Sequence, residues 1–426
     1  MLSFARLKNS SLIRDSFWAV FGNGLSNGLM LIAGIIIARY LGKDIYGEYG
    51  LVKTTMFSIG VFATLGLGTS ITKYIASAIK NNPEELKGLA TNAMQLTFIG
   101  SASLACLLLI FAKQVAEFLD DPGLTVPLRF LSIIILFRAI QITQAGILGG
   151  YRKYKVIARN NIVSACVMLV LASVLTYYWG LIGALFALLT SQVITTILNF
   201  IYIVRLNKTL KHQRTVYKRK ELLSFSIPIA LQNLSYYITT WGGNIILAKV
   251  STLGQLGILN AALQWNAIVM VIPGLLVNVI LSHLSSSVDD SSKHKHILRI
   301  MLLCNLACTA IPFIIVYIAA PWICSFYGPT FSGMPNVLRI LIFSTIFTCC
   351  SNVFSSEFIA QGRNWTLCVS RFIRDIIAIS LCYFLVIGNG KESGAISYSI
   401  AYVIAEISFF IALFVGYRFL ILKKKE

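Results

Sequence analysis

Residues 16–38 read SFWAVFGNGLSNGLMLIAGIIIA, a run of 23 residues without a charged side chain. A helix that crosses the hydrocarbon layer of a bilayer needs about 20 apolar residues, so this run predicts a membrane-spanning helix. Working outward from it, similar apolar runs alternate with short polar connections along the whole chain. We predict twelve spans, at 16–38, 50–71, 88–111, 125–149, 160–179, 181–204, 222–247, 257–281, 297–319, 336–359, 368–387 and 394–417.

The composition supports this all-α integral membrane class. Of the 426 residues, 57% are hydrophobic and only 12% are charged, whereas about a quarter of the residues in a soluble domain are charged. Twelve spans with short connections occupy nearly all of the chain, which leaves no room for a soluble catalytic domain. The nine cysteines show no CxxC or Cys/His spacing, so we expect buried filler and no metal site.

The basic residues predict the orientation. The formal charge is +20, but the charges lie in short stretches between apolar runs, so lipid headgroups explain them better than nucleic acid does. With twelve spans, 27 of the 36 Lys and Arg residues lie on the side of both termini and 5 on the other side. Cytoplasmic loops are enriched in Lys and Arg, so we predict that both termini are cytoplasmic.

The two halves of the chain resemble each other. The basic loop at 205–220 separates two sets of six predicted spans, which defines lobes 1–210 and 211–426. Four matches occur in chain order at offsets of 207 to 211, and they pair Arg129 with Arg339, Arg152 with Arg363, Gly183 with Gly394, and Gly47 and Gly50 with Gly254 and Gly257. Six spans per copy predict parallel repeats, an architecture found in transporters.

Two motifs resemble a known family. ARYLGKDIYGEYG at 38–50 is similar to the ARxLGxxxYGxY signature of bacterial polysaccharide exporters, and SFSIPIALQNL at 224–234 is similar to the entry of their seventh span. The glycine echo LGQLGIL at 253–259 and the central basic loop also fit. The chain therefore resembles the O-antigen flippase type of the multidrug/oligosaccharidyl-lipid/polysaccharide exporter superfamily over essentially its whole length.

The resemblance implies a function and a location. Such proteins move undecaprenyl-diphosphate-linked oligosaccharide from the cytoplasmic to the periplasmic leaflet of the bacterial inner membrane, beside polymerase and glycosyltransferase partners. Spans one, two, seven and eight line their central cavity. One departure concerns Gly243 and Asn244, where many members carry an acidic–basic pair.

Polar stripes on apolar spans predict a cavity lining independently of the resemblance. A charged, sugar-bearing headgroup needs a wet and polar route through the hydrocarbon layer. Candidate lining residues on spans one, seven and eight are Asn23, Asn27, Asn233, Tyr236, Tyr237, Trp241, Asn244, Asn260 and Gln264. The alternative is that these amides form hydrogen bonds between packed helices.

Four basic residues are candidate phosphate ligands. Arg138 lies 14 residues before Arg152, about 21 Å along a helix, which is too far for its charge to reach the cytoplasm. An ionisable group at such depth is a functional hypothesis by default, although a structural pair with a carboxylate or carbonyl groups would also explain it. Arg39 and Lys53 would mark the periplasmic exit and Lys73 the cytoplasmic entrance, unless they only extend toward the interface.

Few carboxylates lie within the spans. Glu406 shares a helix face with Tyr398 and Tyr402 and is a candidate proton or sodium site; a hydrogen-bonded structural glutamate is the alternative. For Asp375 we expect a local ion pair with neighbouring arginines. No cofactor is expected, and no GxxxxGK[ST] loop for ATP hydrolysis is present in the sequence.

Three other functions remain as alternatives. A drug exporter of the same superfamily should carry more buried carboxylates. A membrane polysaccharide-synthesis enzyme should have a large external loop with ionisable groups, and a scaffold would not need Arg138. The four histidines, His212, His283, His294 and His296, all lie near basic loops, where we expect contacts with solvent and lipid headgroups.

Overall fold

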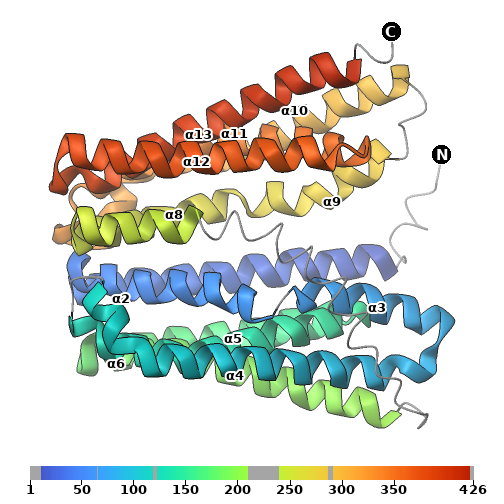
Figure 1. Ribbon diagram of the computed structural model, residues 1–426, viewed down its shortest axis with the longest axis horizontal. Coiled ribbons are helices and arrows are strands. Elements are labelled where there is room, and N and C mark those ends of the chain that lie inside the picture. Colours follow the sequence, from blue (N-terminus) through green and yellow to red (C-terminus); the bar gives the residue numbers. More distant parts are fainter. Residues whose placement is uncertain (1–10, 65, 119–121, 210–238, 286–290, 423–426) are drawn as a thin grey trace. The chain divides into compact units, whose positions relative to one another are not determined.

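The computed structural model describes residues 11–64, 66–118, 122–209, 239–285 and 291–422, and these residues form helices and short turns without any strand (Figure 1). Eight helices of this described part are long and apolar enough to cross a membrane. The α-helices of the described part, including those too short for this criterion, are α2 (Ser11–Ala63), α3 (Leu67–Asn81), α4 (Leu86–Phe118), α5 (Thr125–Gly150), α6 (Tyr154–Thr209), α8 (Leu253–Val269), α9 (Val271–Ser285), α10 (Ser291–Ser325), α11 (Met334–Ala360), α12 (Asn364–Asn389) and α13 (Gly394–Gly416).

The two longest helices, α2 with 53 residues and α6 with 56, are each interrupted at a glycine. Within α2, Gly42 has φ 72° and ψ 171°. Within α6, Gly180 has φ 54° and ψ −131°. Only glycine adopts such positive φ values without steric cost. The two breaks lie between predicted spans one and two and between predicted spans five and six.

The second predicted span, 50–71, is not one continuous helix. Helix α2 ends at Ala63 and α3 begins at Leu67, and Gly66 between them has φ 75°. The amide of Leu67 donates a hydrogen bond to Thr64 O over 2.9 Å, which closes a tight turn. Thr64, Gly66 and Leu67 are buried, and the apolar pattern of the sequence runs on past them, so hydropathy alone could not find the end of α2.

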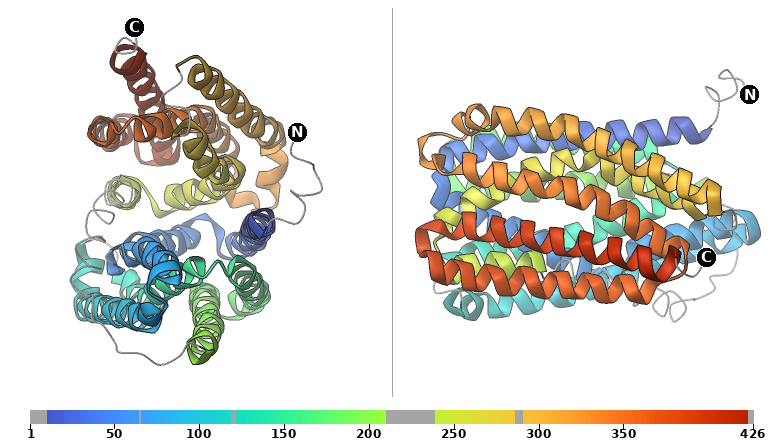
Figure 2. Two further views of the ribbon diagram at one scale, coloured as in Figure 1. Left: turned by 90° about the vertical axis from the view of Figure 1, so that its right-hand side faces the viewer. Right: turned by 90° about the horizontal axis from the view of Figure 1, so that it is seen from above.

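The chain divides into two compact units. Unit 1 comprises Met1–Leu41 and Glu48–Tyr237, and unit 2 comprises Gly42–Gly47 and Ile238–Glu426. A short part of α2 thus packs with unit 2 although it precedes most of unit 1 in sequence. The predicted boundary between residues 210 and 211 lies outside the described residues. Within each unit the helices run side by side along a common direction (Figure 2).

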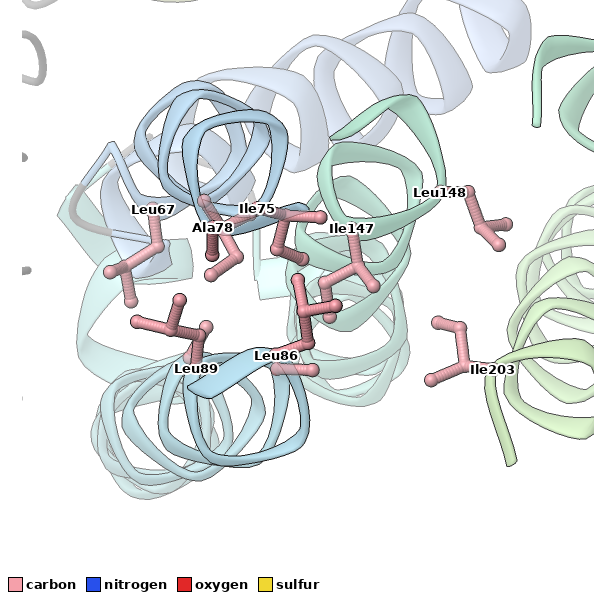
Figure 3. Packing of buried hydrophobic residues seen from close by; sticks show 11 residues of the cluster. Leu67, Ile75, Ala78, Leu86, Leu89, Ile147, Leu148 and Ile203 are labelled. Carbon is pink, nitrogen blue, oxygen red and sulfur yellow. The ribbon is translucent and has the colours of Figure 1, made fainter. Parts of the chain in front are cut away.

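In unit 1, α5 is the central helix and packs on α3, α4 and α6. Figure 3 shows the buried cluster of this bundle, where Leu67 and Ile75 from α3, Leu86 from α4 and Ile147 from α5 point toward one another. On the other side of α5, Leu148 faces Ile203 of α6. Close approach of α3 and α5 depends on a small residue: a Cβ on Gly146 would lie 2.1 Å from Gly68 O. Thr72 Oγ1 also donates a hydrogen bond across this contact, 2.9 Å to Gly146 O.

In unit 2, α11 has the corresponding place and packs on α9, α10 and α12, as well as on α8 and α13. A second buried cluster joins Ile280 of α9, Leu298 of α10, Phe354 of α11 and Phe409 of α13. Helices α5 and α11 are the predicted repeat partners at an offset of 210, so the two units share an order of packing around equivalent helices.

Helices α5 and α11 also end in the same way. After α5, Arg152 N donates to Gly149 O and Lys153 N to Leu148 O, both over 2.9 Å. After α11, Gly362 N donates to Ile359 O over 3.0 Å and Arg363 N to Phe358 O over 2.8 Å. Both are Schellman motifs, in which the first residue after the cap is left-handed; Arg152 has φ 57° and Gly362 has φ 71°.

This geometry corrects the predicted pairing of Arg152 with Arg363. The equivalent of Arg152 is Gly362, and Arg363 corresponds to Lys153. The sequence match favoured like residues at these positions, whereas the hydrogen bonds fix an offset of 210.

Candidate functional site

The first two predicted site residues of α2, Asn23 and Asn27, lie on the exposed side of this helix. Asn23 and Asn27 are exposed, whereas Ser26 is buried and donates a 2.6 Å hydrogen bond to Gly22 O. Gly22 packs on Ala158 of α6, so this side of α2 faces the unit interior. The two asparagines therefore point away from the core of unit 1, and among the described contacts they make no hydrogen bond between its helices.

The peripheral basic candidates lie on α2 and α3. Arg39 of α2 and Lys73 of α3 are exposed, and Lys53 of α2 is half-buried. Their places are consistent with either role that the sequence left open, attraction of a phosphate or extension toward the interface.

Arg138 lies where α5 meets α2. Its Nη1 donates a 2.9 Å hydrogen bond to Gln141 Oε1, one turn along α5. Its guanidinium carbon lies 4.7 Å from the centre of the Phe57 ring, a cation–π distance. Space for the aliphatic part comes from Gly60, where a Cβ would lie 2.9 Å from Arg138 Cγ. Both of these contacts are with uncharged groups.

In unit 2, Asn244 is fully buried and Trp241 is partly exposed. Asn244 Nδ2 donates a 2.9 Å hydrogen bond to Thr240 O one turn earlier, and Asn244 Oδ1 is buried without a hydrogen bond to any described residue. A bare acceptor of this kind in a helix is costly unless water or a ligand reaches it.

The departure from the family at Gly243 has a structural explanation. A Cβ at Gly243 would lie 2.4 Å from Cε2 of Tyr398, so the tyrosine ring occupies the space of a side chain there. Tyr398 in turn stacks on Tyr402, with ring centres 6.3 Å apart and planes 9° from parallel. An acidic or basic side chain at residue 243 could not coexist with this packing.

The candidates on α8 are bound inside unit 2. Asn260 is buried and donates a 3.0 Å hydrogen bond to Leu256 O. Gln264 Nε2 donates to the Tyr46 hydroxyl, which belongs to the part of α2 that packs with this unit. The Gln264 contact joins two helices, as the sequence left open for single amides, whereas the Asn260 bond lies within α8.

Trp265, next to Gln264 on α8, also binds a tyrosine hydroxyl. Trp265 Nε1 donates a 3.0 Å hydrogen bond to the hydroxyl of Tyr327, in the turn after α10. Burial raises the pKa of Tyr327 well above its usual value, so that hydroxyl stays protonated at any physiological pH.

Three predicted residues of the seventh span, Asn233, Tyr236 and Tyr237, lie outside the described residues. Their role remains the prediction made from the sequence.

Glu406 is part of a buried ionic cluster. Its Oε1 lies 3.3 Å from Arg374 Nη1, and its Oε2 accepts a 3.1 Å hydrogen bond from Thr348 Oγ1. Arg374 also binds Asp375, with 2.7 Å between Nη2 and Oδ1, which confirms the predicted local ion pair. Arg371 lies one helical turn before Asp375 on α12. Two arginines and two carboxylates make the cluster formally neutral.

Arg374 as a partner of Glu406 was missed because the two residues are 32 positions apart, on α12 and α13. The signal was present: a buried carboxylate on one apolar helix implies a cation on a neighbouring one. Only the packing of α12 on α13 selects Arg374 for that role.

The expectation for His294 was wrong. His294 is not in contact with solvent or headgroups; its side chain is buried, and Nε2 lies 2.7 Å and 2.8 Å from the two carboxylate oxygens of Glu357. Gln361 Nε2 donates a 3.0 Å hydrogen bond to Glu357 Oε1. The sequence did not predict this pair because His294 lies in a basic stretch, where exposed side chains are expected. In helix α10 the His294 side chain is buried, whereas His296 is exposed.

The sequence and fold resemble known proteins. A candidate O-antigen transporter of Shigella flexneri is 22% identical over 398 residues, 92% of this chain and 94% of that protein. The stage V sporulation protein B of Bacillus subtilis is 24% identical over 44% of this chain and 37% of its own length.

Two solved structures have a similar fold. An inward-facing multidrug resistance MATE family transporter of the MOP superfamily has a TM-score of 0.78 at 18% identity, covering 94% of this chain and 96% of that one. The lipid II flippase MurJ in an inward closed conformation has a TM-score of 0.74 at 16% identity, covering 94% of this chain and 87% of that one.

A family profile covers more than half of the sequence. The profile is described as polysaccharide biosynthesis protein and matches residues 12–283. Together with the fold, this match identifies the chain as a member of the polysaccharide biosynthesis protein family.

Proposed function

We propose that this protein is a flippase that carries an undecaprenyl-diphosphate-linked oligosaccharide from the cytoplasmic to the periplasmic leaflet of the bacterial inner membrane. The observation that carries the proposal is the position of Arg138, a cation within the apolar helix α5 that donates a hydrogen bond to Gln141 and lies against the Phe57 ring. A guanidinium in that setting is suited to a diphosphate, which it can bind through two hydrogen bonds. The related O-antigen transporter and the fold shared with a lipid II flippase support the substrate class.

The proposed topology has twelve crossings with both termini in the cytoplasm. Helices α2 and α6 count as two crossings each because Gly42 and Gly180 break them. Helices α8 and α9 count as one, and the helical residues 239–250 end another. The excess of basic residues on one side supports the orientation.

In the proposed cycle, the two lobes alternate between states open to either side while the lipid tail stays in the bilayer. Lys73 attracts the diphosphate at the cytoplasmic entrance, Arg138 binds it at depth, and Arg39 and Lys53 receive it at the exit. Amides and aromatic rings contact the sugar; the candidates are Asn23, Asn27, Asn233, Tyr236, Tyr237, Trp241, Asn244, Asn260 and Gln264. The bare acceptor Asn244 Oδ1 supports this assignment most directly in unit 2.

Ion coupling is proposed at Glu406. Because its cluster with Arg374, Arg371 and Asp375 is neutral, binding of one proton to Glu406 would leave an unbalanced positive charge and weaken the contact of α12 with α13. Such a change would link proton uptake to movement of these helices. Export of a small drug is the alternative, and the similar MATE fold supports it. A site lined by Arg and Lys disfavours the cationic compounds that such an exporter would carry.

The test compares Arg138→Gln with Arg129→Gln in a deletion strain and in proteoliposomes. Arg129 is on the same helix but exposed, so it is a matched control. We expect Arg138→Gln to lower flipping of the lipid-linked oligosaccharide by about 10-fold or more, the loss of one charge-assisted hydrogen bond, with substrate accumulating in the cytoplasmic leaflet. Glu406→Gln should remove the dependence of the rate on a pH gradient.

Equal flipping by the Arg138 and Arg129 variants would contradict the phosphate role. An unchanged lipid-linked pool in the deletion strain would contradict the flippase itself.

A further inference from the structure

A groove with a volume of ≈ 570 Å³ runs along unit 1 between α4 and α6. Its walls are mostly apolar and are formed by Met94, Phe98, Ile99, Phe200, Ile203 and Val204, and the polar side chain of Gln95 also lines it. The size lies within the range of about 300–1,000 Å³ that is typical of small-molecule sites. None of the residues discussed above as a candidate for transport lines it, so the groove is separate from the proposed route.

The groove is held open by packing that is independent of any ligand. Helices α4 and α6 both pack on α5, which keeps them apart. Ala90 and Ile203, one from each wall, also belong to the buried cluster shown in Figure 3. A concave apolar surface that rests on a packed core does not collapse when it is empty.

The groove has a polar end. Thr91 and Asn207 line it there, and Asn207 Oδ1 is buried without a hydrogen bond to any described residue. Beyond this end the two walls continue as basic residues: Lys87 precedes Thr91 by one helical turn, and Lys208 follows Val204 by one turn. Lys208 and its neighbour Arg205 are exposed. Glu84 and Glu85 precede α4, so the positive charge is concentrated on the α6 side.

The length of the groove selects the kind of ligand. From Ala90 to Ile99 the α4 wall extends about 14 Å, close to half of the ~30 Å hydrocarbon thickness. The groove therefore spans about one leaflet, from its basic end to the middle of the bilayer. An acyl chain of a membrane lipid matches this depth, whereas the longer isoprenoid chain of an undecaprenyl carrier would extend well beyond it.

We propose that this groove binds one acyl chain of an anionic phospholipid, with the headgroup phosphate at Arg205 and Lys208 and a polar group of the lipid at Asn207. Basic pockets between membrane helices recognise anionic headgroups in this way. The proposal does not depend on what the chain transports, because the groove, its polar end and its charges are present in any case.

The test uses purified full-length protein and phosphatidylglycerol with a photoreactive acyl chain. We expect cross-links on Met94 to Ile99 and Phe200 to Val204, and competition by unlabelled phosphatidylglycerol that is about 10-fold stronger than by phosphatidylcholine. Cross-links spread evenly over all lipid-facing helices would overturn the proposal, as would equal competition by the two lipids. Stronger competition by an isoprenyl diphosphate would also overturn it.

Variants separate the chain from the headgroup. Thr91→Trp fills the groove and should reduce retained phosphatidylglycerol in native mass spectrometry by about 10-fold, whereas Ile110→Trp, on the exposed far part of α4, should not. Arg205→Gln with Lys208→Gln should abolish only the preference for phosphatidylglycerol, and Lys113→Gln, at the other end of α4, should leave it unchanged. Full retention by Thr91→Trp, or an unchanged preference in the double variant, would contradict the assignment.

Discussion

At the residue scale, the turn after α5 carries a local cost that the equivalent turn after α11 avoids. Both turns require a left-handed residue, and this residue is Arg152 in one and Gly362 in the other. A side chain in the left-handed conformation costs about 1–2 kcal/mol relative to glycine. The hydrogen bonds of Arg152 N and Lys153 N hold the arginine in this conformation despite the cost. Its side chain adds a positive charge next to Lys153.

We predict that Arg152→Gly raises the midpoint of thermal unfolding in detergent, by a stabilisation of about 1 kcal/mol. Gly362→Arg should lower it by a similar amount, and Lys153→Gly should give no gain because positive φ is confined to Arg152 in this turn. The measurement is a fluorescence melt of the purified variants. A loss of stability in Arg152→Gly equal to that in Gly362→Arg would refute the argument from φ.

The pair formed by His294 and Glu357 is a second feature of single residues. Removing one partner of a buried pair leaves an uncompensated polar or charged group and costs about 3–5 kcal/mol. His294→Leu should therefore destabilise the protein strongly, and the double variant with Glu357→Leu should recover part of the loss. His296→Leu is the matched control because His296 is exposed. Indistinguishable melting curves for the two histidine variants would count against the pair.

At the scale of elements, two glycines allow part of α2 to contact the start of α8. A Cβ on Gly257 would lie 1.9 Å from Lys43 O, and one on Gly47 would lie 1.9 Å from Leu253 O. These glycines come from the repeated motifs YGEYG and LGQLG, so the two copies of the motif pack on each other. The sequence showed the repetition, but not that the copies touch.

We predict that Gly257→Ala costs about 1–3 kcal/mol, the range for overpacking a tight contact. Gly274→Ala in α9 should be neutral or slightly stabilising, because nothing lies within 4 Å of a Cβ there and alanine favours helix. The measurement is the midpoint of thermal unfolding of each purified variant, compared with that of the unmodified protein. If Gly257→Ala is as stable as Gly274→Ala, the close approach of the two backbones is not required.

At the scale of the molecule, the proposed orientation makes a prediction about accessibility. In a cysteine-free background, a cysteine at Lys391 or Lys43 should react with a membrane-impermeant maleimide from the periplasmic side. A cysteine at Lys153 should react only after the membrane is permeabilised. The physical reason is that the connections after an odd number of crossings lie on one side and those after an even number on the other. Labelling of Lys153 and Lys391 from the same side would refute twelve crossings.

The amino-acid sequence alone predicts a helical membrane protein with two similar halves. Apolar runs such as 16–38 are too long and too hydrophobic for water and predict burial in lipid. In lipid such a run forms a helix, because a helix satisfies its own backbone hydrogen bonds. The family motifs and the ion pair at Asp375 were likewise readable, since each involves residues close together in the chain.

The contacts between distant residues could be identified only from the folded structure. The pairs Arg374 with Glu406 and His294 with Glu357, the offset of 210 between the repeats, and the groove between α4 and α6 all depend on how helices pack. Hydropathy records only that a helix face is apolar; it does not record which neighbour covers that face. Side chains from helices far apart in sequence come together through ridges, grooves and glycine contacts, and these are properties of the packed surface.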